Sequence, residues 1–374
     1  MNDFAKHLSY KNQINFGSFY TPKKYVDLVK LWMHEYAING QYTIMDPSCG
    51  YGAFFQLKEE YEDNQYIGND IDEFAVKKAK EYFPFVRFYN KNLFTNVSRD
   101  NYGIKSNEKL IIVGNPPYND VTSQAHQNLK KVIIDMDDDI KTRDYGMTSL
   151  LVYNKLEADY VIVLHPLSYL IKKANFNSCL KFLRNYKLVE HIIFNSQEFT
   201  NTSKTMGFPI IVAMYQRNVD NGISYNDILN MKFRTIEGNS FSLNDRDYLS
   251  KYIKKYPNND RYDKEILFYT LRDINALKRS RTFIKNRETN AVDVNPQKLS
   301  YYCYIDCFKM FANTPYYMGN FDIPFIYNEF NNIEDDVLKI SKYEHQDIFG
   351  IQKDSPKIES INKVKNYINK VLEY

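Results

Sequence analysis

Short apolar runs recur between residues 42 and 215 of the chain, and several of them end in an acid, an amide or a glycine. They predict buried β-strands at 42–46, 66–69, 86–89, 111–113, 159–166, 189–194 and 209–215. Amphipathic segments at 23–36, 73–82 and 149–156 have apolar residues near helical spacing. Strands that alternate with helices form mostly parallel sheets with helices on both faces. We therefore expect an α/β fold built on a doubly wound sheet.

This alternation fades after the stretch 217–222, where turn residues and clustered tyrosines replace it. We predict a domain boundary here, with residues 1–218 forming a larger domain and residues 219–374 a smaller α+β domain. A chain of 374 residues is long enough for two domains that each bury a core.

Composition narrows the possible partners only slightly. The net charge is +3 and charged residues make up 25% of the chain, so any surface for a polyanion must be local. The start of the chain is polar and no apolar run approaches the roughly 20 residues of a membrane span, which predicts a cytoplasmic protein without membrane contact. Four scattered cysteines and the lack of a histidine pair at metal spacing predict a reduced protein without a metal site.

The fourth apolar run ends in a rigid polar turn, Asn115-Pro116-Pro117-Tyr118. Proline fixes φ and has no N–H, so the chain cannot continue a ladder, and the Asn115 side chain and the Pro116 carbonyl can face a ligand. The Tyr118 ring adds a flat face beside these two acceptors. Two acceptors next to a stacking ring suit the exocyclic amine of a planar base.

A glycine loop follows the first run, and acids end the second. Gly50 and Gly52 have no Cβ, so a ligand can approach the backbone closely. Asp46, at the end of the strand, can accept a hydrogen bond from a cationic amine. Asp70 lies eighteen residues beyond Gly52, near the spacing at which nucleoside-binding folds hold ribose hydroxyls. The third glycine of the dinucleotide fingerprint is missing, which argues against a nicotinamide cofactor.

These phrases, in this order, resemble those of S-adenosylmethionine-dependent amino-methyltransferases, above all the γ class of DNA adenine-N6 methyltransferases. The turn resembles the family's Asn-Pro-Pro-Tyr motif, the phrase at 46–54 its motif I, and the phrase at 16–22 its motif X. The resemblance implies a Rossmann-like class I methyltransferase sheet with S-adenosylmethionine as cofactor. The chain is also similar to compact methylases of type II restriction-modification systems with short palindromic targets, among them the CATG-specific group.

The resemblance implies that an adenine flipped out of the duplex binds at the turn, with its amine on the two acceptors and its ring against two aromatic side chains. The catalytic residues concerned are Asn115, Pro116, Pro117, Tyr118 and Phe199. Phe208 is the alternative to Phe199, because both flank the stretch that corresponds to the family's motif VIII.

The cofactor contacts that the resemblance implies lie on several segments. They are Tyr20, Thr21, Asp46, Pro47, Ser48, Gly50, Gly52, Phe54, Asp70, Ile71, Asn92, Leu93 and Asn115. Asn92 stands where the family usually has an aspartate. Thr21 and Asp72 each have a second interpretation as a helix N-cap, and Pro22 would then be the first helical residue after Thr21.

The predicted C-terminal domain contains a basic stretch at 271–298, with seven basic residues against three acidic ones. In a DNA enzyme this excess favours phosphate contacts over a merely solvated surface. The candidates are Lys278, Arg279, Arg281, Lys285 and Arg287. The order of motifs leaves no room for a recognition domain between motif I and the turn, so target recognition falls to residues 219–374. Double-stranded DNA and a cognate restriction endonuclease are the expected partners.

Several alternatives stay open, because planar amines and amides all suit this turn: RNA (guanine N2 or adenine N6), cytosine N4 and glutamine N5 of a protein. Cytosine-N4 enzymes more often carry Ser or Asp in place of Asn115. Glutamine-N5 enzymes put a helical domain before motif I, whereas 45 residues precede Asp46 here. C5-cytosine methylation is disfavoured, since no cysteine follows a proline. A noncatalytic DNA-binding protein that retains the fold is a further alternative, which the intact acids argue against.

Overall fold

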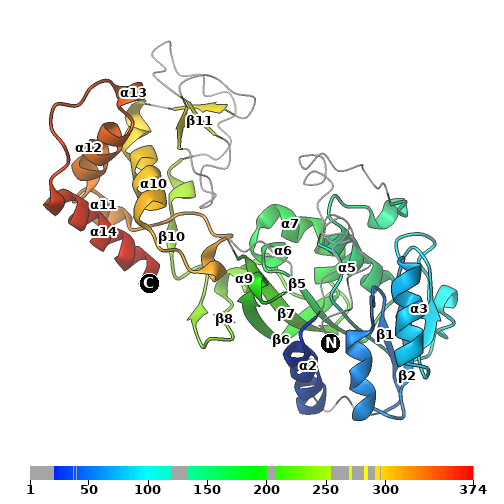
Figure 1. Cartoon of the computed structure of the whole chain (residues 1–374). Coiled ribbons are helices and arrows are strands. Elements are labelled where there is room, and N and C mark those ends of the chain that lie inside the picture. The colour runs from blue at the N-terminus through cyan, green and yellow to red at the C-terminus, as the bar shows by residue number, and fades with distance from the viewer. Residues whose placement is uncertain are drawn as a thin grey trace. The chain divides into compact units, whose positions relative to one another are not determined.

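The computed structural model describes residues 21–36, 38, 40–118, 134–199, 207–253, 269–271, 282–284, 291–294 and 296–373. The chain divides into two compact units, Met1–Phe241 and Ser242–Tyr374 (Figure 1).

The first unit is built on a seven-stranded sheet of order β3-β2-β1-β4-β5-β7-β6. Its strands are β1 (Thr43–Asp46), β2 (Gln65–Asn69), β3 (Arg87–Tyr89), β4 (Leu110–Gly114), β5 (Tyr160–Pro166), β6 (Tyr186–Asn195) and β7 (Pro209–Arg217). Neighbours from β3 to β5 are parallel, and β7 is antiparallel to both β5 and β6. This is the class I methyltransferase sheet, so the predicted fold is confirmed. The strand order reverses between β1 and β4, where open α/β sheets bind ligands beyond the carboxyl ends of the strands.

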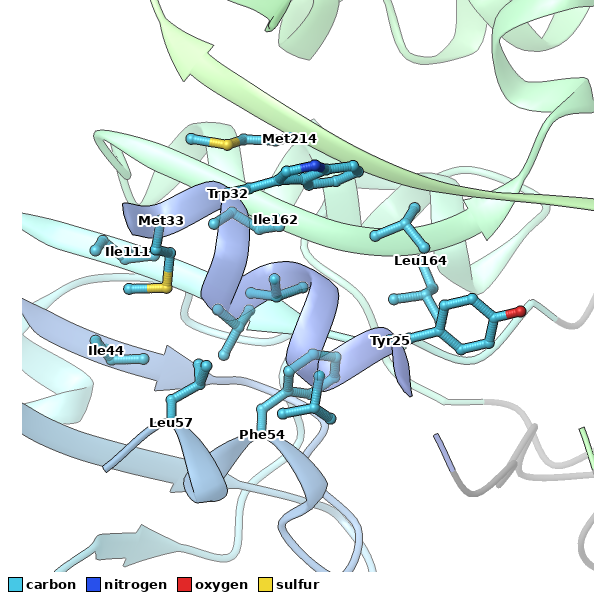
Figure 2. Close-up of a cluster of buried hydrophobic side chains, with 14 of the residues drawn as sticks. Tyr25, Trp32, Met33, Ile44, Phe54, Leu57, Ile111, Ile162, Leu164 and Met214 are labelled. Carbon is cyan, nitrogen blue, oxygen red and sulfur yellow. The ribbon is translucent and has the colours of Figure 1, made fainter. Parts of the chain in front are cut away.

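Helices and short 3-10 turns precede, connect and follow these strands. They are α2 (Lys23–Glu35), η1 (Ala53–Glu59), α3 (Glu73–Tyr82), η2 (Asp100–Tyr102), η3 (Asp138–Ile140), α5 (Tyr145–Lys155), α6 (Ser168–Ile171), α7 (Lys173–Ser178), α8 (Leu180–Leu183), η4 (Ser196–Glu198) and α9 (Tyr225–Asn230). The apolar stripe of α2 packs with η1 on one face of the sheet, where its residues meet Ile44, Ile111 and Ile162 (Figure 2). The intervening Met45 and Ile112 are also fully buried, so both faces of the central strands are covered.

Two helix starts differ from the sequence prediction. The N-cap of α2 is Pro22, with no side-chain cap, so the capping role of Thr21 was wrong. Helix α5 begins at Tyr145 instead of residue 149, because the Asp144 carboxylate caps it by accepting from the Met147 amide N–H at 3.1 Å. By contrast, α3 spans the predicted residues, and Asp72 caps it through the amide N–H groups of Phe74 and Ala75.

The first unit continues past the last strand of the sheet. Helix α9 is followed by a hairpin of β8 (Phe233–Arg234) and β9 (Ser240–Phe241). Ile193 of β6 bridges Thr235, and the Ile236 amide N–H donates to the Ile193 carbonyl at 2.8 Å. These contacts attach the hairpin to the edge of the sheet, which is why the first compact unit extends beyond the boundary predicted at residue 218.

The second unit is α+β, as predicted for the C-terminal part. Its strands are β10 (Asp247–Tyr248), β11 (Tyr269–Leu271), β12 (Phe283–Ile284), β13 (Ala291–Asp293) and β14 (Pro324–Phe325). Its helices are η5 (Leu249–Lys251), η6 (Pro296–Lys298), α10 (Leu299–Phe311), η7 (Tyr316–Met318), α11 (Tyr327–Phe330), α12 (Glu334–Glu344), α13 (Gln346–Phe349) and α14 (Ile358–Glu373). Its core lies among α10, α12 and α14, with Tyr304 fully buried against Phe325 and Tyr367. A role of this unit in target recognition stays a prediction.

Within the described ranges, no helix is long and apolar enough to cross a membrane. In the same ranges, no three His, Cys, Asp or Glu side chains are grouped so that they could hold a metal ion. All four cysteines are buried free thiols.

Candidate active site

The acid of the first strand and the turn after the fourth strand meet at the switch point. Strands β1 and β4 pair in parallel through Met45 and Ile112, which puts Asp46 beside the end of β4. A Cβ at Gly114 would lie only 3.0 Å from Asp46 Oδ1. Asn115 is the next residue along the chain. The predicted cofactor acid and the predicted amine acceptor therefore belong to one site.

Asp46 is 2% exposed and accepts a hydrogen bond from the Ser48 amide N–H at 3.2 Å. Burial raises the pKa of its carboxyl well above the ordinary value, and the nearby Asp70 carboxylate raises it further. A buried carboxylate of this kind gains from a cationic partner, because the partner's charge favours the ionised form. The electrostatics of Asp46 thus suit a ligand that carries a positive charge.

The glycine loop is held against the end of β2. The Gly50 amide N–H donates to Asp70 Oδ2 at 2.7 Å, and the Asp72 amide N–H donates to Asp70 Oδ1 at 2.9 Å. Gly50 has φ +48°, and a Cβ there would meet no protein atom within 4 Å. Ile71 is 48% exposed beside this carboxylate. The glycine loop thus presents open space, and the residues after β2 present an oriented acid and an exposed apolar side chain.

Sequence reasoning missed Asn69, which holds this edge of the site together. Its side chain is 1% exposed and donates to the carbonyls of Pro47 and Lys91, each at 3.1 Å. Its Oδ1 accepts from the Lys91 amide N–H, also at 3.1 Å. One amide side chain thereby joins the loops after β1, β2 and β3. The available signal was a polar residue at the end of an otherwise apolar run.

The acceptor turn, Asn115–Tyr118, is fixed by contacts at both ends of the Asn115 amide. Its Nδ2 donates to the Thr21 hydroxyl at 3.2 Å, and its Oδ1 accepts from the Tyr118 hydroxyl. Pro116 is buried, and Asn115 and Tyr118 are partly buried. Burial raises the pKa of the Tyr118 phenol well above its ordinary value, so the phenol stays neutral and can donate.

Other predicted site residues lie further into the protein. Phe54 is 1% exposed in the core under α2, and Phe199 is 2% exposed with its ring 5.5 Å from that of Phe194 (Figure 2 labels Phe54). The side-chain oxygen Oδ1 of Asn92 accepts from the Phe94 amide N–H at 3.0 Å. The roles predicted for these residues stay predictions.

Some predicted residues lie outside the described part of the chain. They are Tyr20 of the cofactor set and the basic residues Lys278, Arg279, Arg281, Lys285 and Arg287.

The comparison with known families agrees with this geometry. The family model described as N-6 DNA Methylase matches residues 1–203, which is more than half of the chain. The chain belongs to this family. Members of the family are methyltransferases, and the predicted cofactor S-adenosylmethionine is therefore confirmed for this methylase. The donor set fits this cofactor, because Asp46 suits a cationic amine, Asp70 suits ribose hydroxyls, and Ile71 offers an apolar surface to a ring.

Individual relatives match a smaller part of the chain or have low sequence identity. The type II methyltransferase M.CvrRI of Paramecium bursaria Chlorella virus XZ-6E is 30% identical to the methylase over 118 residues. The match covers 31% of this chain and 28% of that relative, so it spans less than a third of either.

Two solved structures are among those that resemble this chain. A proposed RNA methyltransferase of Pyrococcus horikoshii is 11% identical, with a TM-score of 0.38, and the match covers 58% of this chain and 95% of that one. TrmN of Thermus thermophilus is 12% identical, with a TM-score of 0.32, and the match covers 52% of each chain. The fold rests on the strand order described above.

Proposed function

We propose that this methylase transfers a methyl group to N6 of an adenine in double-stranded DNA, as the modification enzyme of a type II restriction-modification system. The proposal rests on the position of Asn115, which directly follows Gly114. A Cβ added at Gly114 would lie 3.0 Å from Asp46 Oδ1. An acceptor for an amine therefore lies next to the acid suited to the cofactor. The family model and the type II methyltransferase relative support the same substrate class.

The amine of adenine is a poor nucleophile, because its lone pair is delocalised into the ring. S-adenosylmethionine supplies an activated methyl group. The Asn115 Oδ1 and the Pro116 carbonyl oxygen accept hydrogen bonds from the two N6 hydrogens, which favours a pyramidal nitrogen and directs its lone pair towards the cofactor side of the site. A carbonyl oxygen has two lone pairs, so Asn115 can accept from the amine while it accepts from the Tyr118 hydroxyl.

An adenine inside a duplex cannot reach this turn, so the base must leave the stack. The Tyr118 ring then provides a stacking face, worth about 1–3 kcal/mol per base. A 2-aminopurine probe at the target position should be extruded and quenched by wild-type protein. In Tyr118→Ala, any probe still extruded should brighten. A probe that stays dark in both proteins would contradict the stacking role.

The basic stretch of the C-terminal part supplies phosphate contacts in this proposal. If Lys278 and Arg279 contact DNA, removal of either charge should weaken binding to all sequences and reduce the slope of log K against log salt by roughly one unit. Unaltered salt dependence in the double variant would mean that these charges are merely solvated. Arg184, an exposed cation on the first unit, provides a charge-matched control.

The substrate class is tested by radiolabel transfer from S-adenosylmethionine to DNA, RNA and protein in parallel. Label in DNA alone supports the proposal, and label in RNA or protein alone refutes it. Methylation-aware sequencing of host DNA, with and without the protein, then identifies the target site. A cognate restriction endonuclease would cleave this site only when it is unmethylated.

A further inference from the structure

The proposed target-base site has two predicted walls, and the segment Thr21–Tyr25 contacts both. This segment comprises the two residues before α2 and the first turn of that helix. One wall is the acceptor turn, where Asn115 Nδ2 donates to the Thr21 hydroxyl at 3.2 Å. Thr21 is 4% exposed, so water competes little for this contact. The two ends of an Asn amide have nearly the same shape, and only their hydrogen bonds decide which end faces a ligand. The Tyr118 hydroxyl donates to Oδ1, and the Thr21 hydroxyl accepts from Nδ2, so the two contacts together hold the amide in one orientation.

The other wall is the turn Ser196–Phe199, formed by η4 and the residue after it. The Tyr25 hydroxyl donates to Glu198 Oε2, and the Lys24 ammonium pairs with the same oxygen. Figure 2 shows the Tyr25 hydroxyl pointing away from the apolar cluster that surrounds α2. The Tyr25 ring stacks on Phe194 with centroids 4.0 Å apart, and Phe194 contacts Phe199. The segment therefore holds this turn by both a polar and an aromatic contact.

Helix α2 can serve as a fixed support because it is anchored by its own core. Val26, Val29 and Met33 are at most 1% exposed, and Trp32 is 5% exposed. Buried apolar side chains in close-packed contact leave a helix little freedom to move. A segment continuous with this helix is therefore held in place relative to the sheet. The contacts of Thr21 and Tyr25 transmit this placement to residues 94 and 173 positions away in sequence.

We propose that Thr21–Tyr25 is a positioning segment that assembles the target-base site: Thr21 sets the orientation of the Asn115 amide, and Tyr25 with Lys24 holds the Ser196–Phe199 turn through Glu198. This inference rests on the proposed function. It directs the Thr21 hydroxyl to the catalytic amide, whereas the family resemblance implies a contact of Thr21 with the cofactor.

The first experiment replaces the Thr21 hydroxyl by a methyl group of similar shape. In Thr21→Val, kcat on DNA should fall about tenfold to a hundredfold, because Asn115 loses the contact that keeps its acceptor on the amine. The KM for S-adenosylmethionine should change little. Thr21→Ser restores the acceptor and should recover most of the wild-type kcat. A Thr21→Val variant with raised cofactor KM and unchanged kcat would overturn this role.

The second experiment separates the polar contact at Glu198 from the aromatic packing. Tyr25→Phe removes only the donated hydroxyl, and Glu198→Met keeps the length of the side chain but removes both acceptor oxygens. Each should impair target methylation by several-fold, and the double variant should be scarcely worse than either single variant, since all three interrupt one interaction. Effects that multiply in the double variant, or no effect in either single variant, would overturn the role of Glu198.

Asp27→Asn is a matched control on the same helix. It breaks the exposed Lys23–Asp27 pair, which lies outside the site, and should leave every parameter at the wild-type value. The same assays distinguish a failure of the proposed function from a failure of the positioning role. If wild-type protein methylates no DNA, the proposed function is refuted. If wild-type protein and Thr21→Val methylate DNA equally well, only the positioning role is refuted.

Discussion

The two glycines of the loop after β1 should respond differently to the same substitution. Both have positive φ, +48° at Gly50 and +84° at Gly52, so alanine is strained at either position. A Cβ at Gly50 would meet no protein atom within 4 Å. A Cβ at Gly52 would lie 2.6 Å from Phe55 Cδ2 and 2.9 Å from Phe83 Cε2. Gly52 is thus required for packing, whereas the open space at Gly50 agrees with the cofactor contact predicted there.

These distances determine how much stability and cofactor affinity each variant should lose. Alanine in the left-handed region costs about 1–2 kcal/mol, which is the whole expected loss of stability for Gly50→Ala. For Gly52→Ala, overpacking against the buried Phe55 ring and the partly buried Phe83 ring adds about 1–3 kcal/mol. Gly50→Ala should nevertheless lose at least about tenfold in affinity for S-adenosylmethionine, equivalent to about 1.4 kcal/mol, because its new methyl group occupies the space of the cofactor.

Urea unfolding measures the first quantity, and titration calorimetry of the folded proteins measures the second. Gly40→Ala is a control, because Gly40 also has positive φ and open space but lies outside the site. It should lose stability without losing cofactor affinity. A Gly50→Ala variant that binds S-adenosylmethionine as tightly as wild type would mean that the cofactor does not pass over this loop.

Two further predictions concern stability. The Arg99 guanidinium donates to five backbone carbonyls around the start of β4 and the end of α5, so Arg99→Lys should lower the free energy of unfolding by about 1–3 kcal/mol in urea titrations. Arg87→Lys, which loses one exposed contact, is the control, and equal effects would contradict this explanation. The hydrogen bond that the protonated His345 ring donates to the Asp306 carboxylate raises the pKa of His345 above its ordinary 6.5. The stability that this bond contributes is therefore complete below pH 6.5 and is lost as the pH rises through the raised value. Thermal unfolding across this range should show that loss in wild type and not in His345→Gln, and a pH-independent wild type would refute it.

Much of the fold could be predicted because its strands carry their own signal. The runs that became β1, β4 and β5 are mostly apolar, since parallel strands at the centre of such a sheet are buried on both faces. Their parallel pairing brings their carboxyl ends to one edge. The adjacency of Asp46 and Asn115 follows from that arrangement, although 69 positions of sequence separate them.

Contacts between polar side chains that are distant in sequence could not be predicted in this way. Thr-Pro before an amphipathic run has the pattern of a helix N-cap, yet the Thr21 hydroxyl contacts Asn115. Nothing in the local sequence distinguishes these two uses, because the choice depends on tertiary contacts. The same holds for Tyr25 and Glu198, which are ordinary residues of a helix and a turn until the fold brings them together.

Mass spectrometry of nucleosides tests most directly the claim that Asn115 accepts a hydrogen bond from the amine of a target adenine. DNA treated with wild-type protein and S-adenosylmethionine is digested and analysed for N6-methyladenine, N4-methylcytosine and other methylated bases. We expect N6-methyladenine alone, formed about 10²–10³-fold more slowly by a folded, cofactor-binding Asn115→Ala variant. Methylation confined to another base, or N6-methyladenine formed at the wild-type rate by Asn115→Ala, would contradict the claim.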